Sequence, residues 1–583
     1  MPKTQAASSS AGPPLDDKPQ GKSSISIALR DTEACPEAET VSPQPGVHWN
    51  VYTCVSIAGA YLILLLNSLQ MTVVSSLAPY VTSAFSSHSL LPVTSLISSV
   101  VTGVIQLPLS RIIDRYGRPQ GLIAMIVLDV LGLIIMATCT NVLYYVGADG
   151  VIYIIRVFAM DKATVETRSL VYGLSLYTYF ITPFAGPALA QAYYKAGIWR
   201  WAFGSLAIII PGVSGTLTLL FVWNEKRRQV NQLKESRSGE KTQPSIWKTV
   251  WFHILDLDVL GVLLACFGLG LILLPLSLAT KGMKGWGSPA TICMVVVGVF
   301  CLVALAVYES RFAPRTFIDF GLLRDRTAWG ACLCMGGQSL SLYMWWSYYT
   351  SFLQVVHFQN IKNAGYILNT HQIGSAVFSV LTGLALKYTH RFKVVNAAGF
   401  AITTLGTGLM IHFSLPESPF GGVLASHVLI SMSSGMLAAS EIAAVLNDTD
   451  DGTFSMRVAL LFLFSWVGSA IGSTIATPMW RSRFPYLLEK YLPSELKSQA
   501  QTIYGSLEAQ LSYDRGTPGR DAIIKAMTET WKYMAIGGTA TLAVAWIGVL
   551  LLKEGKPRDG GTKKIANSGG DECEKVEHSS SKP

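Results

Sequence analysis

Long stretches of this sequence contain almost no charged residue, and this feature constrains the fold more than any other. A membrane-spanning helix needs about 20 predominantly apolar residues, and stretches of that length recur along the whole 583-residue chain. Only 14% of the residues are charged, against roughly 25% in a typical soluble domain. The sequence therefore predicts an all-α integral membrane protein. It argues against a soluble enzyme, a nucleic-acid-binding protein and a disordered scaffold.

The apolar stretches divide into fourteen predicted transmembrane helices, which is an even number and places both ends of the chain on one side. In chain order these spans are 51–74, 90–110, 120–139, 142–159, 169–191, 202–223, 257–279, 289–308, 327–350, 366–386, 394–413, 421–443, 457–478 and 532–552.

Basic residues in the short connections set the predicted orientation. Three Arg lie in 111–118, seven Lys or Arg in 224–248, four Arg in 311–326 and three Lys or Arg in 387–393. Membrane proteins keep Lys and Arg in their cytosolic loops, so these connections and both tails are predicted to be cytosolic. The net charge of +9 follows from this bias and does not indicate a nucleic-acid partner.

The order of spans predicts two six-helix bundles separated by an inserted helix pair, an arrangement more typical of transporters than of receptors. The predicted domains are a disordered cytosolic tail (1–48), a six-helix bundle (49–223), a basic cytosolic loop (224–256), an inserted helix pair with a cytosolic loop (257–326), a six-helix bundle with a long external loop at 479–531 (327–552) and a disordered cytosolic tail (553–583).

The sequence lacks the motifs of common enzyme and metal sites. It contains no Walker A loop, no HExxH and no nucleophile elbow, so we expect no enzymatic activity. The nine cysteines lie in apolar spans or in the tails, and none forms a CxxC pair. They are interpreted as buried thiols. No cofactor and no metal held by the protein are predicted.

The turn after the second span carries a recognisable motif. Asp114, Arg115, Gly117 and Arg118 resemble the loop motif of the major facilitator superfamily, with Ser110 where its first glycine is usual. Gly117 permits a tight turn. Asp114 is placed where a carboxylate could contact basic groups or a helix N-terminus of the opposite bundle. We interpret these four residues as a conformational latch, and an ordinary basic loop is the alternative.

Further segments are similar to fungal siderophore–iron transporters, and the similarity runs from about Trp49 to Lys553. The segments that carry it are Trp199–Gly204, Ser351–Val356, Ala364–Ile367, Gly472–Ile475, Tyr491–Pro493 and Leu511–Tyr513. The resemblance implies a major facilitator fold and proton-coupled uptake of ferric, hydroxamate-type siderophores by alternating access. The iron then travels inside the substrate, which agrees with the absence of a predicted metal site.

Two other functions stay open at this stage. A fourteen-span drug–proton antiporter keeps the fold and reverses the direction, although the first span carries Asn67 and Gln70 and no carboxylate. A receptor without transport is suggested by the third and fourth spans, because the connection around Asn141 is very short.

Charged residues inside predicted spans are the proton-coupling candidates, because a charge at the bilayer centre costs ~2.5–3.5 kcal/mol on insertion scales. Glu441 lies among small residues in the twelfth span, and Asp129 lies in the third. Asp149 and Arg156 lie seven residues apart in the fourth span, on one helix face. A structural hydrogen bond is the alternative for each of them.

Aromatic and polar residues inside other spans are candidates for binding a large, mostly neutral chelate, because such side chains combine apolar area with hydrogen bonding. An interfacial aromatic belt or ordinary packing is the alternative. The candidates are Trp345, Tyr348 and Tyr349 in the ninth span, His371 and Gln372 in the tenth, and Tyr177 in the fifth.

The predicted external loop at 479–531 is long enough to act as a lid. Apolar spacing around Leu496–Leu511 predicts a short amphipathic helix, and Tyr491, Tyr504 and Tyr513 are the lid candidates. A tolerated surface insertion is the alternative, because loop entropy rises only slowly with length.

The expected partners follow from the resemblance. They are a ferric siderophore, protons and the lipid bilayer, with no nucleic acid, and the expected state is a monomer. The plasma membrane is the expected location, with endosomal or vacuolar vesicles as the alternative.

Overall fold

The structure is a computed structural model that describes residues 51–85, 88–116, 118–139, 178–216, 258–278, 287–311, 325–389, 391–446 and 454–554. Within these ranges every regular element is a helix. Seven of the described helices are long and apolar enough to cross a membrane. These findings confirm the prediction of an all-α membrane protein. The predicted fourth span lies outside the described residues, so the count of fourteen stays a prediction.

The N-terminal half shares one apolar core. Val73 and Leu77, Leu133 and Met136, and Phe203 are buried together in it. The described elements of this half are α1 (Val51–Ala84), the short η1 (His88–Leu90), α2 (Leu91–Tyr116), α3 (Arg118–Thr138), α7 (Thr178–Lys195) and a helix over 199–216. Helix α2 contributes no residue to this core and packs mostly against helices outside the half.

Helix α1 continues ten residues beyond its predicted end at 74. The hydropathy signal fades there because the added turns carry Ser and Thr. Their hydroxyls donate to carbonyls of the same helix, as Ser76 does to Thr72 at 2.7 Å and Ser83 to Pro79 at 2.6 Å. Satisfied hydroxyls of this kind let a polar sequence remain helical inside a protein.

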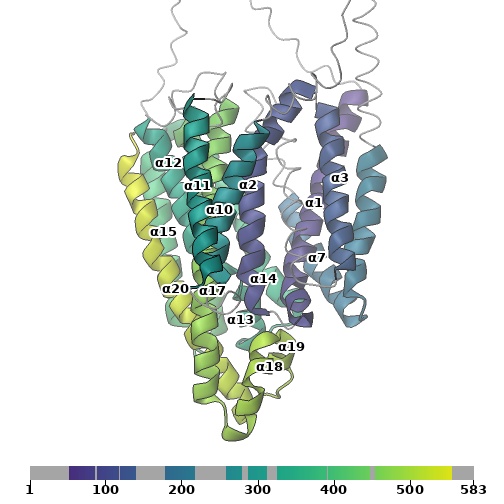
Figure 1. Cartoon of the computed structure of the whole chain (residues 1–583), viewed down its shortest axis with the longest axis vertical. Coiled ribbons are helices and arrows are strands. Elements are labelled where there is room, and N and C mark those ends of the chain that lie inside the picture. The colour runs from purple at the N-terminus through teal and green to yellow at the C-terminus, as the bar shows by residue number, and fades with distance from the viewer. Residues whose placement is uncertain are drawn as a thin grey trace, which may run out of the picture. The chain divides into compact units, whose positions relative to one another are not determined.

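The C-terminal half packs its helices at close range. Helix α12 lies against α17 and α20 (Figure 1). Helix α16 lies against α14 and α15. Small residues permit this, since a Cβ on Gly337 would lie 2.7 Å from the backbone nitrogen of Ala545. The elements are α12 (Arg326–Trp346), α13 (Tyr349–Val355), α14 (Ile361–Thr389), α15 (Phe392–Phe413), α16 (Phe420–Leu446), α17 (Phe454–Tyr491) and α20 (Pro518–Leu551).

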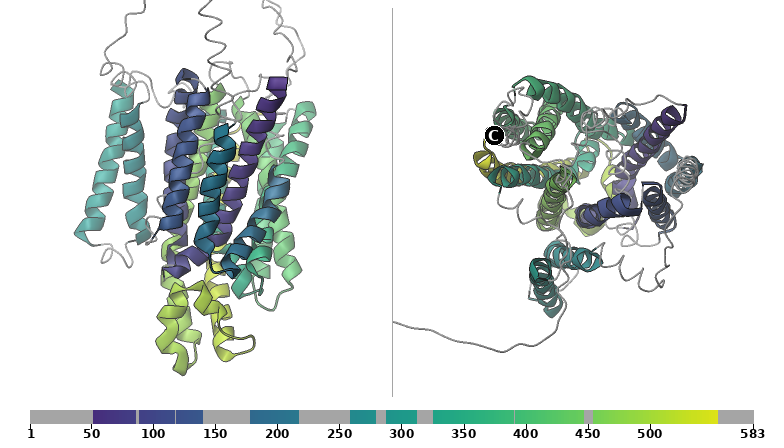
Figure 2. Two further views of the ribbon diagram at one scale, coloured as in Figure 1. Left: turned by 90° about the vertical axis from the view of Figure 1, so that its right-hand side faces the viewer. Right: turned by 90° about the horizontal axis from the view of Figure 1, so that it is seen from above.

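Helices α10 (Val259–Leu278) and α11 (Pro289–Arg311) form the pair that follows the first bundle in the chain. They pack against each other, and α10 also contacts α2 and α17. Two views in Figure 2 show the pair at the side of the other helices. Most of α11 is exposed, including Val296, Phe300 and Val303. Apolar side chains that point away from the protein suit contact with lipid.

Two predicted boundaries in the C-terminal half are wrong. The span predicted at 327–350 breaks after Trp346, and α13 begins separately at Tyr349. The loop predicted at 479–531 is largely helical, because α17 continues to Tyr491 and α20 begins at Pro518. Hydropathy detects the part of a helix that lies in lipid, and it gives no signal where the same helix extends into water.

The connection between α17 and α20 therefore spans only residues 492–517, which is shorter than the predicted loop, and it is ordered. It contains η4 (Ser494–Gln499), α18 (Ala500–Gly505) and α19 (Leu507–Leu511). Figure 1 shows α18 and α19 beyond one end of the long helices. The distribution of basic residues assigns this end to the outside, and we call it the outer end. The expected helical structure around Leu496–Leu511 is present as these short helices.

Candidate functional site

Asp129 of α3 is one of two carboxylates buried among the described helices of the bundles. Its side chain is 1% exposed. Gln70 of α1 donates through Nε2 to Asp129 Oδ1 at 2.8 Å, while Asp129 Oδ2 and Gln70 Oε1 have no hydrogen-bond partner among the described residues. An amide can satisfy either the charged or the neutral carboxyl group. The pair can therefore hold or release a proton without losing this contact.

Glu441 of α16 is the second buried carboxylate, in the C-terminal half. It is fully buried, and neither carboxyl oxygen makes a hydrogen bond to a described residue. Asn396 of α15 lies beside it but donates its amide to Ser440 Oγ at 3.0 Å. Cys332 and Cys334 of α12 lie on its other side. A buried carboxyl group in a membrane span is a candidate for taking up and releasing a proton.

A cluster of aromatic and imidazole rings lies nearer the outer end of the C-terminal half. His427 of α16 is fully buried, with its ring centroid 4.9 Å from Tyr349 and 6.0 Å from His371. Trp346 lies 5.2 Å from His371, and Trp531 of α20 lies 5.9 Å from Tyr349. The cluster joins side chains from α12, α13, α14, α16 and α20. It brings together three of the predicted binding residues, Trp345, Tyr349 and His371, and Gln372 follows His371 in α14.

Several polar atoms of this cluster are buried without a hydrogen-bond partner among the described residues. They are both ring nitrogens of His427, Nδ1 of His371, the hydroxyl of Tyr349 and Nε1 of Trp531. Oε1 of Gln372, the residue after His371, is also buried without such a partner. A buried polar group without a partner is costly. Such groups gathered between aromatic rings are suited to hydrogen bonding a polar ligand or water.

Tyr348 belongs to a different layer from Tyr349. Its ring stacks on Trp480 of α17 at 3.8 Å, and its hydroxyl donates to the Ser89 carbonyl at 3.0 Å. His88 packs edge-on against both rings. Because Ser89 and His88 come from the N-terminal half, Tyr348 helps to join the two halves at the outer end.

Further hydrogen bonds between the halves lie at the same end. Tyr80 of α1 donates to Gln354 of α13, and Gln191 of α7 accepts from the Lys362 backbone nitrogen at 2.9 Å. The helices also approach closely here, since a Cβ on Gly365 would lie 2.6 Å from Pro187 Cβ. The described residues therefore form a state in which the halves meet at the outer end.

The α17–α20 connection contacts both halves. Arg520 is 3% exposed and donates to the carbonyls of Gln510 and Val355, the latter at 3.0 Å, which fixes the connection to α13. Toward the N-terminal half, the Leu507 backbone nitrogen donates to Ser83 Oγ at 3.0 Å, and Tyr194 donates to Glu508 at 2.5 Å. The connection lies across the junction of the halves.

The three tyrosines predicted for a lid stabilise the connection itself. Tyr491 donates to Glu529 at 2.8 Å, and Tyr513 donates to Gln499 at 2.8 Å. Tyr504 is buried close to Phe484, and burial raises the pKa of its phenol. Contacts with the N-terminal half are made by α18, which packs on η1, and by Leu507 and Glu508, which sequence reasoning did not select.

Comparison with known proteins places this architecture in a family. Residues 60–358 match the Major Facilitator Superfamily. The chain is 36% identical over 508 residues to "MFS siderochrome iron transporter 1" of Ajellomyces capsulatus, covering 86% of each chain. It is 34% identical over 484 residues to "Siderophore iron transporter 1" of Schizosaccharomyces pombe, covering 81% of this chain and 78% of the relative. The chain belongs to the siderophore iron transporter family of the major facilitator superfamily.

Solved structures agree on the major facilitator fold. A bacterial homologue of the human lysosomal transporter Spinster matches with a TM-score of 0.51 at 15% identity, over 86% of this chain and 97% of the other. A peptide transporter crystallised with alafosfalin matches with a TM-score of 0.51 at 12% identity. The match covers 85% of this chain and 95% of the other. At these identities the likeness concerns the fold alone.

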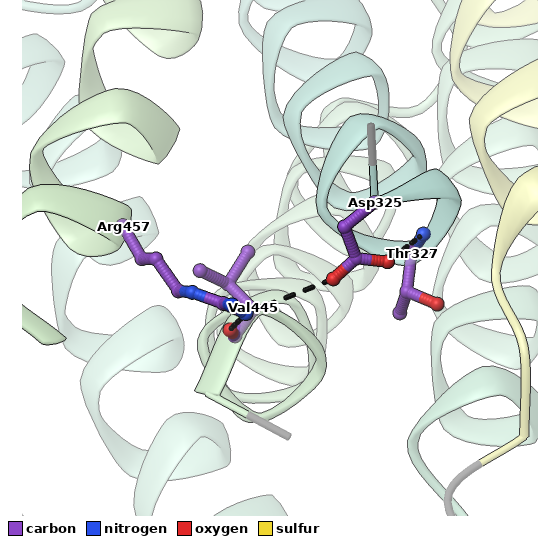
Figure 3. Close-up of polar contacts among 4 residues, drawn as sticks. All are labelled: Asp325, Thr327, Val445 and Arg457. Atoms are coloured by element: carbon purple, nitrogen blue, oxygen red, sulfur yellow. Dashed lines mark hydrogen bonds and ion pairs between the residues drawn. The ribbon is translucent and has the colours of Figure 1, made fainter. Parts of the chain in front are cut away.

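The end of the long helices opposite the outer end, which the basic residues predict to be cytosolic, contains an ion pair in the C-terminal half. Asp325 caps α12 by accepting from the Thr327 backbone nitrogen at 2.9 Å and lies 3.6 Å from Arg457 of α17 (Figure 3). Arg457 also donates to the Val445 carbonyl of α16 at 3.2 Å. These contacts join α12, α16 and α17 at one end.

Part of the predicted site cannot be placed. In the motif of the superfamily, α2 ends at Tyr116 and α3 begins at Arg118, and Gly117 lies outside the described residues. The side chains of Asp114, Arg115 and Arg118 lie outside the description, as do Asp149, Arg156 and Tyr177. Among the described residues, no group of three His, Cys, Asp or Glu could hold a metal ion.

Sequence reasoning missed His427, Trp480 and Trp531. The signal for His427 was the same as for His371, since each is a histidine in an apolar span. The two tryptophans gave no signal, because each lay in the segment interpreted as a loop or at its edge. Their helices continue through that segment and bring them into the protein interior.

Proposed function

We propose that this protein imports ferric siderophores of the hydroxamate type, coupled to protons, by alternating access. The observation that carries the proposal is identity of 34–36% over most of the chain to relatives whose names describe siderochrome or siderophore iron transport. The buried carboxylates and the large aromatic cluster support it, because a proton-coupled carrier of a bulky chelate needs titratable groups and apolar contact area.

The direct test is uptake of radiolabelled iron. Iron-starved fungal cells that lack their own siderophore carriers would express the full chain and receive a panel of ferric hydroxamates, ferric catecholates and ferric citrate. We expect saturable uptake of one or more hydroxamates that collapses when the proton gradient is dissipated. Absence of uptake together with resistance to toxic compounds would instead support an exporter.

Asp129 and Glu441 are the proposed proton-coupling residues, with Asp149 and Arg156 as further candidates. Glu441→Gln retains size and hydrogen bonding and removes titration, so abundance in the membrane should be unchanged. Accumulation against a gradient should fall at least ~10-fold, whereas binding of the chelate should persist. Glu417→Gln, at an exposed site between α15 and α16, is the matched control. Normal pH-dependent uptake by Glu441→Gln would remove this carboxylate from the mechanism.

The proposed chelate contacts are Trp345, Tyr349, His371 and Gln372, together with Tyr177 and Tyr348. The buried polar atoms of the aromatic cluster support this assignment because they lack partners within the described protein. Gln372→Leu removes one acceptor with little change in volume. We expect it to raise KM and leave maximal uptake nearly unchanged, and an unaltered KM would argue against a contact.

We propose that the α17–α20 connection acts as a lid that seals the outer end behind the chelate, with Tyr491, Tyr504 and Tyr513 maintaining its fold. Tyr513→Ala should reduce uptake at limiting chelate without changing abundance. Tyr513→Phe, which loses only the bond to Gln499, is the milder comparison. A chain in which a short flexible linker replaces 492–517 should lose uptake. Full transport by that chain would make the connection a surface insertion.

The remaining assignments rest on the family and on the distribution of charge. Asp114, Arg115, Gly117 and Arg118 are proposed to stabilise the outward-closed or outward-open state as a latch. The functional unit is proposed to be a monomer in the plasma membrane. Fractionation of fungal cells expressing a tagged full chain tests the location, with vesicles of the endosome or vacuole as the competing result.

A further inference from the structure

Two fully buried titratable residues of the C-terminal half lie on the same helix. His427 and Glu441 both belong to α16, and neither makes a hydrogen bond through its side chain to a described residue. They are fourteen residues apart, which is about 21 Å along a helix, and at ~100° per residue they lie within about 40° of each other around its axis. His427 lies toward the outer end of α16 and Glu441 toward its cytosolic end.

The positions between them on this face carry hydroxyl groups. Ser431 and Ser434 follow His427 at the fourth and seventh positions, so they continue the same line. Ser431 Oγ contacts the carbonyls of Thr370 and His371 at 2.9 and 3.0 Å. Gln338 of α12 donates to Ser434 Oγ at 3.0 Å. Ala438 completes the line before Glu441 and is only partly buried.

Serines on other faces of α16 have a different environment. Thr403 donates to Ser433 Oγ at 2.8 Å, and Ser433 donates to the Ile430 carbonyl at 2.9 Å. Asn396 donates to Ser440, which donates to the Leu437 carbonyl at 3.0 Å. These hydroxyls join α15 to α16 and are satisfied. Among the described residues of α16, the line from His427 to Glu441 begins and ends in buried side chains whose polar atoms make no hydrogen bond of good geometry, although the Ile367 and Leu368 carbonyls lie near His427 and Asn396 lies near Glu441.

The groups around the line are mostly uncharged. His371 of α14 and Tyr349 of α13 face His427, and α12 presents two tryptophans to it. Cys332 and Cys334 of α12 face Glu441. Val445 lies one turn beyond Glu441 in α16, and its carbonyl accepts a hydrogen bond from Arg457 of α17. Arg457 also pairs with Asp325 (Figure 3). A proton that reaches Glu441 is therefore close to the cytosolic end.

We infer that α16 conducts the coupled proton from His427 to Glu441 along Ser431, Ser434 and Gln338, with water bridging the intervals. In the transfer an N–H bond of the His427 imidazolium breaks and an O–H bond forms on the Glu441 carboxylate. A separated positive and negative charge thereby become two neutral groups, which low-dielectric surroundings favour. The inference deepens the proposed proton-coupled uptake and rests on it.

The test uses the purified full chain in liposomes with an entrapped pH-sensitive dye and a ferric trihydroxamate as the probe. Two rates are measured: proton influx driven by the chelate, and exchange of labelled for unlabelled chelate at equal pH on both sides. Because His427 also lies in the aromatic cluster, its replacement can weaken chelate binding as well, so the ratio of the two rates is decisive: His427→Gln should lower proton influx at least ~10-fold more than it lowers exchange. His412→Gln, at an exposed position of α15, should leave both rates unchanged.

A second pair of variants tests the line itself. Ser434→Ala should lower proton influx severalfold, whereas Ser433→Ala, one residue away on another face, should leave the ratio of proton influx to exchange unchanged. Wild-type proton influx in both His427→Gln and Ser434→Ala overturns the inference, and so does equal loss of influx and exchange in His427→Gln. If the unmodified chain neither exchanges the chelate nor moves protons, the proposed function itself is wrong.

Discussion

The hydrogen bond between Tyr80 and Gln354 offers the sharpest test of the closed outer end. Tyr80 belongs to α1 and Gln354 to α13, so this bond exists only while the two halves meet. Tyr80→Phe removes the hydroxyl and retains the ring that packs on Tyr194 with centroids 4.3 Å apart. In the open state water would hydrate both polar groups. Removing the hydroxyl therefore destabilises the closed state and leaves the stability of the open state unchanged.

The expected magnitude follows from the burial of the pair. Tyr80 is 5% exposed and Gln354 3% exposed. Loss of the bond costs about 1 kcal/mol, and a buried amide oxygen left without a donor raises the cost to about 3 kcal/mol. A change of 1–3 kcal/mol shifts an equilibrium by roughly 5- to 150-fold. Because apparent affinity scales with the population of the competent state, binding of external chelate should tighten by up to the same factor.

Two measurements check this prediction. Chelate binding to cells gives the apparent external affinity, and hydrogen–deuterium exchange reports opening at α13 and at the outer turns of α1. Maximal uptake should fall, because return to the closed state becomes slower. Tyr388→Phe, at an exposed position of α14, is the control. Unchanged affinity together with unchanged exchange in Tyr80→Phe would refute the idea that this bond stabilises closure.

Four further outcomes are expected. Gly365→Leu should bind chelate but not accumulate it, because its side chain would collide with Pro187 of the other half; accumulation assays in cells decide this. Gly468→Leu, whose side chain would meet the backbone of α12 within one half, should instead lower thermal stability of the purified protein by about 1–3 kcal/mol. Asp129→Asn can still accept from Gln70, so the protein should fold while uptake loses its pH dependence, measured from pH 5 to about 7.5. Burial lowers the pKa of His357 to about 4 from 6.5, so the native state resists protonation and the turn around His357 should lose stability as pH falls from about 6.5 to about 4, seen as faster deuterium exchange.

The membrane-embedded part of the fold was predictable because lipid imposes a simple rule on sequence. Seven of the described long helices contain a strongly apolar stretch, and Asp129 and Glu441 stood out because a charge in an apolar segment is rare. The helical extensions of α17 and α20 were not predictable by the same rule, since they leave the apolar region. Their helical structure depends on packing against each other.

Contacts between distant residues could not be predicted from one sequence. Gln70 was recognised as polar, but its bond to Asp129 joins positions 59 residues apart. Arg520 looked like one more basic residue of an external loop, and its burial depends on two carbonyls supplied by other elements. The separation of Tyr348 from Tyr349 follows from the break between α12 and α13, which periodicity did not indicate.

The length of α17 has a mechanical consequence. Its 38 residues correspond to about 57 Å of helix, and its outer turns are joined to α13 and α20 through the connection anchored by Arg520. When the C-terminal half tilts, the outer tip of α17 therefore moves farther than residues near the centre of rotation. A fluorophore at exposed Glu489 would travel farther than one near the middle of the membrane. A label at this tip would therefore report the conformational changes of single molecules during the transport cycle.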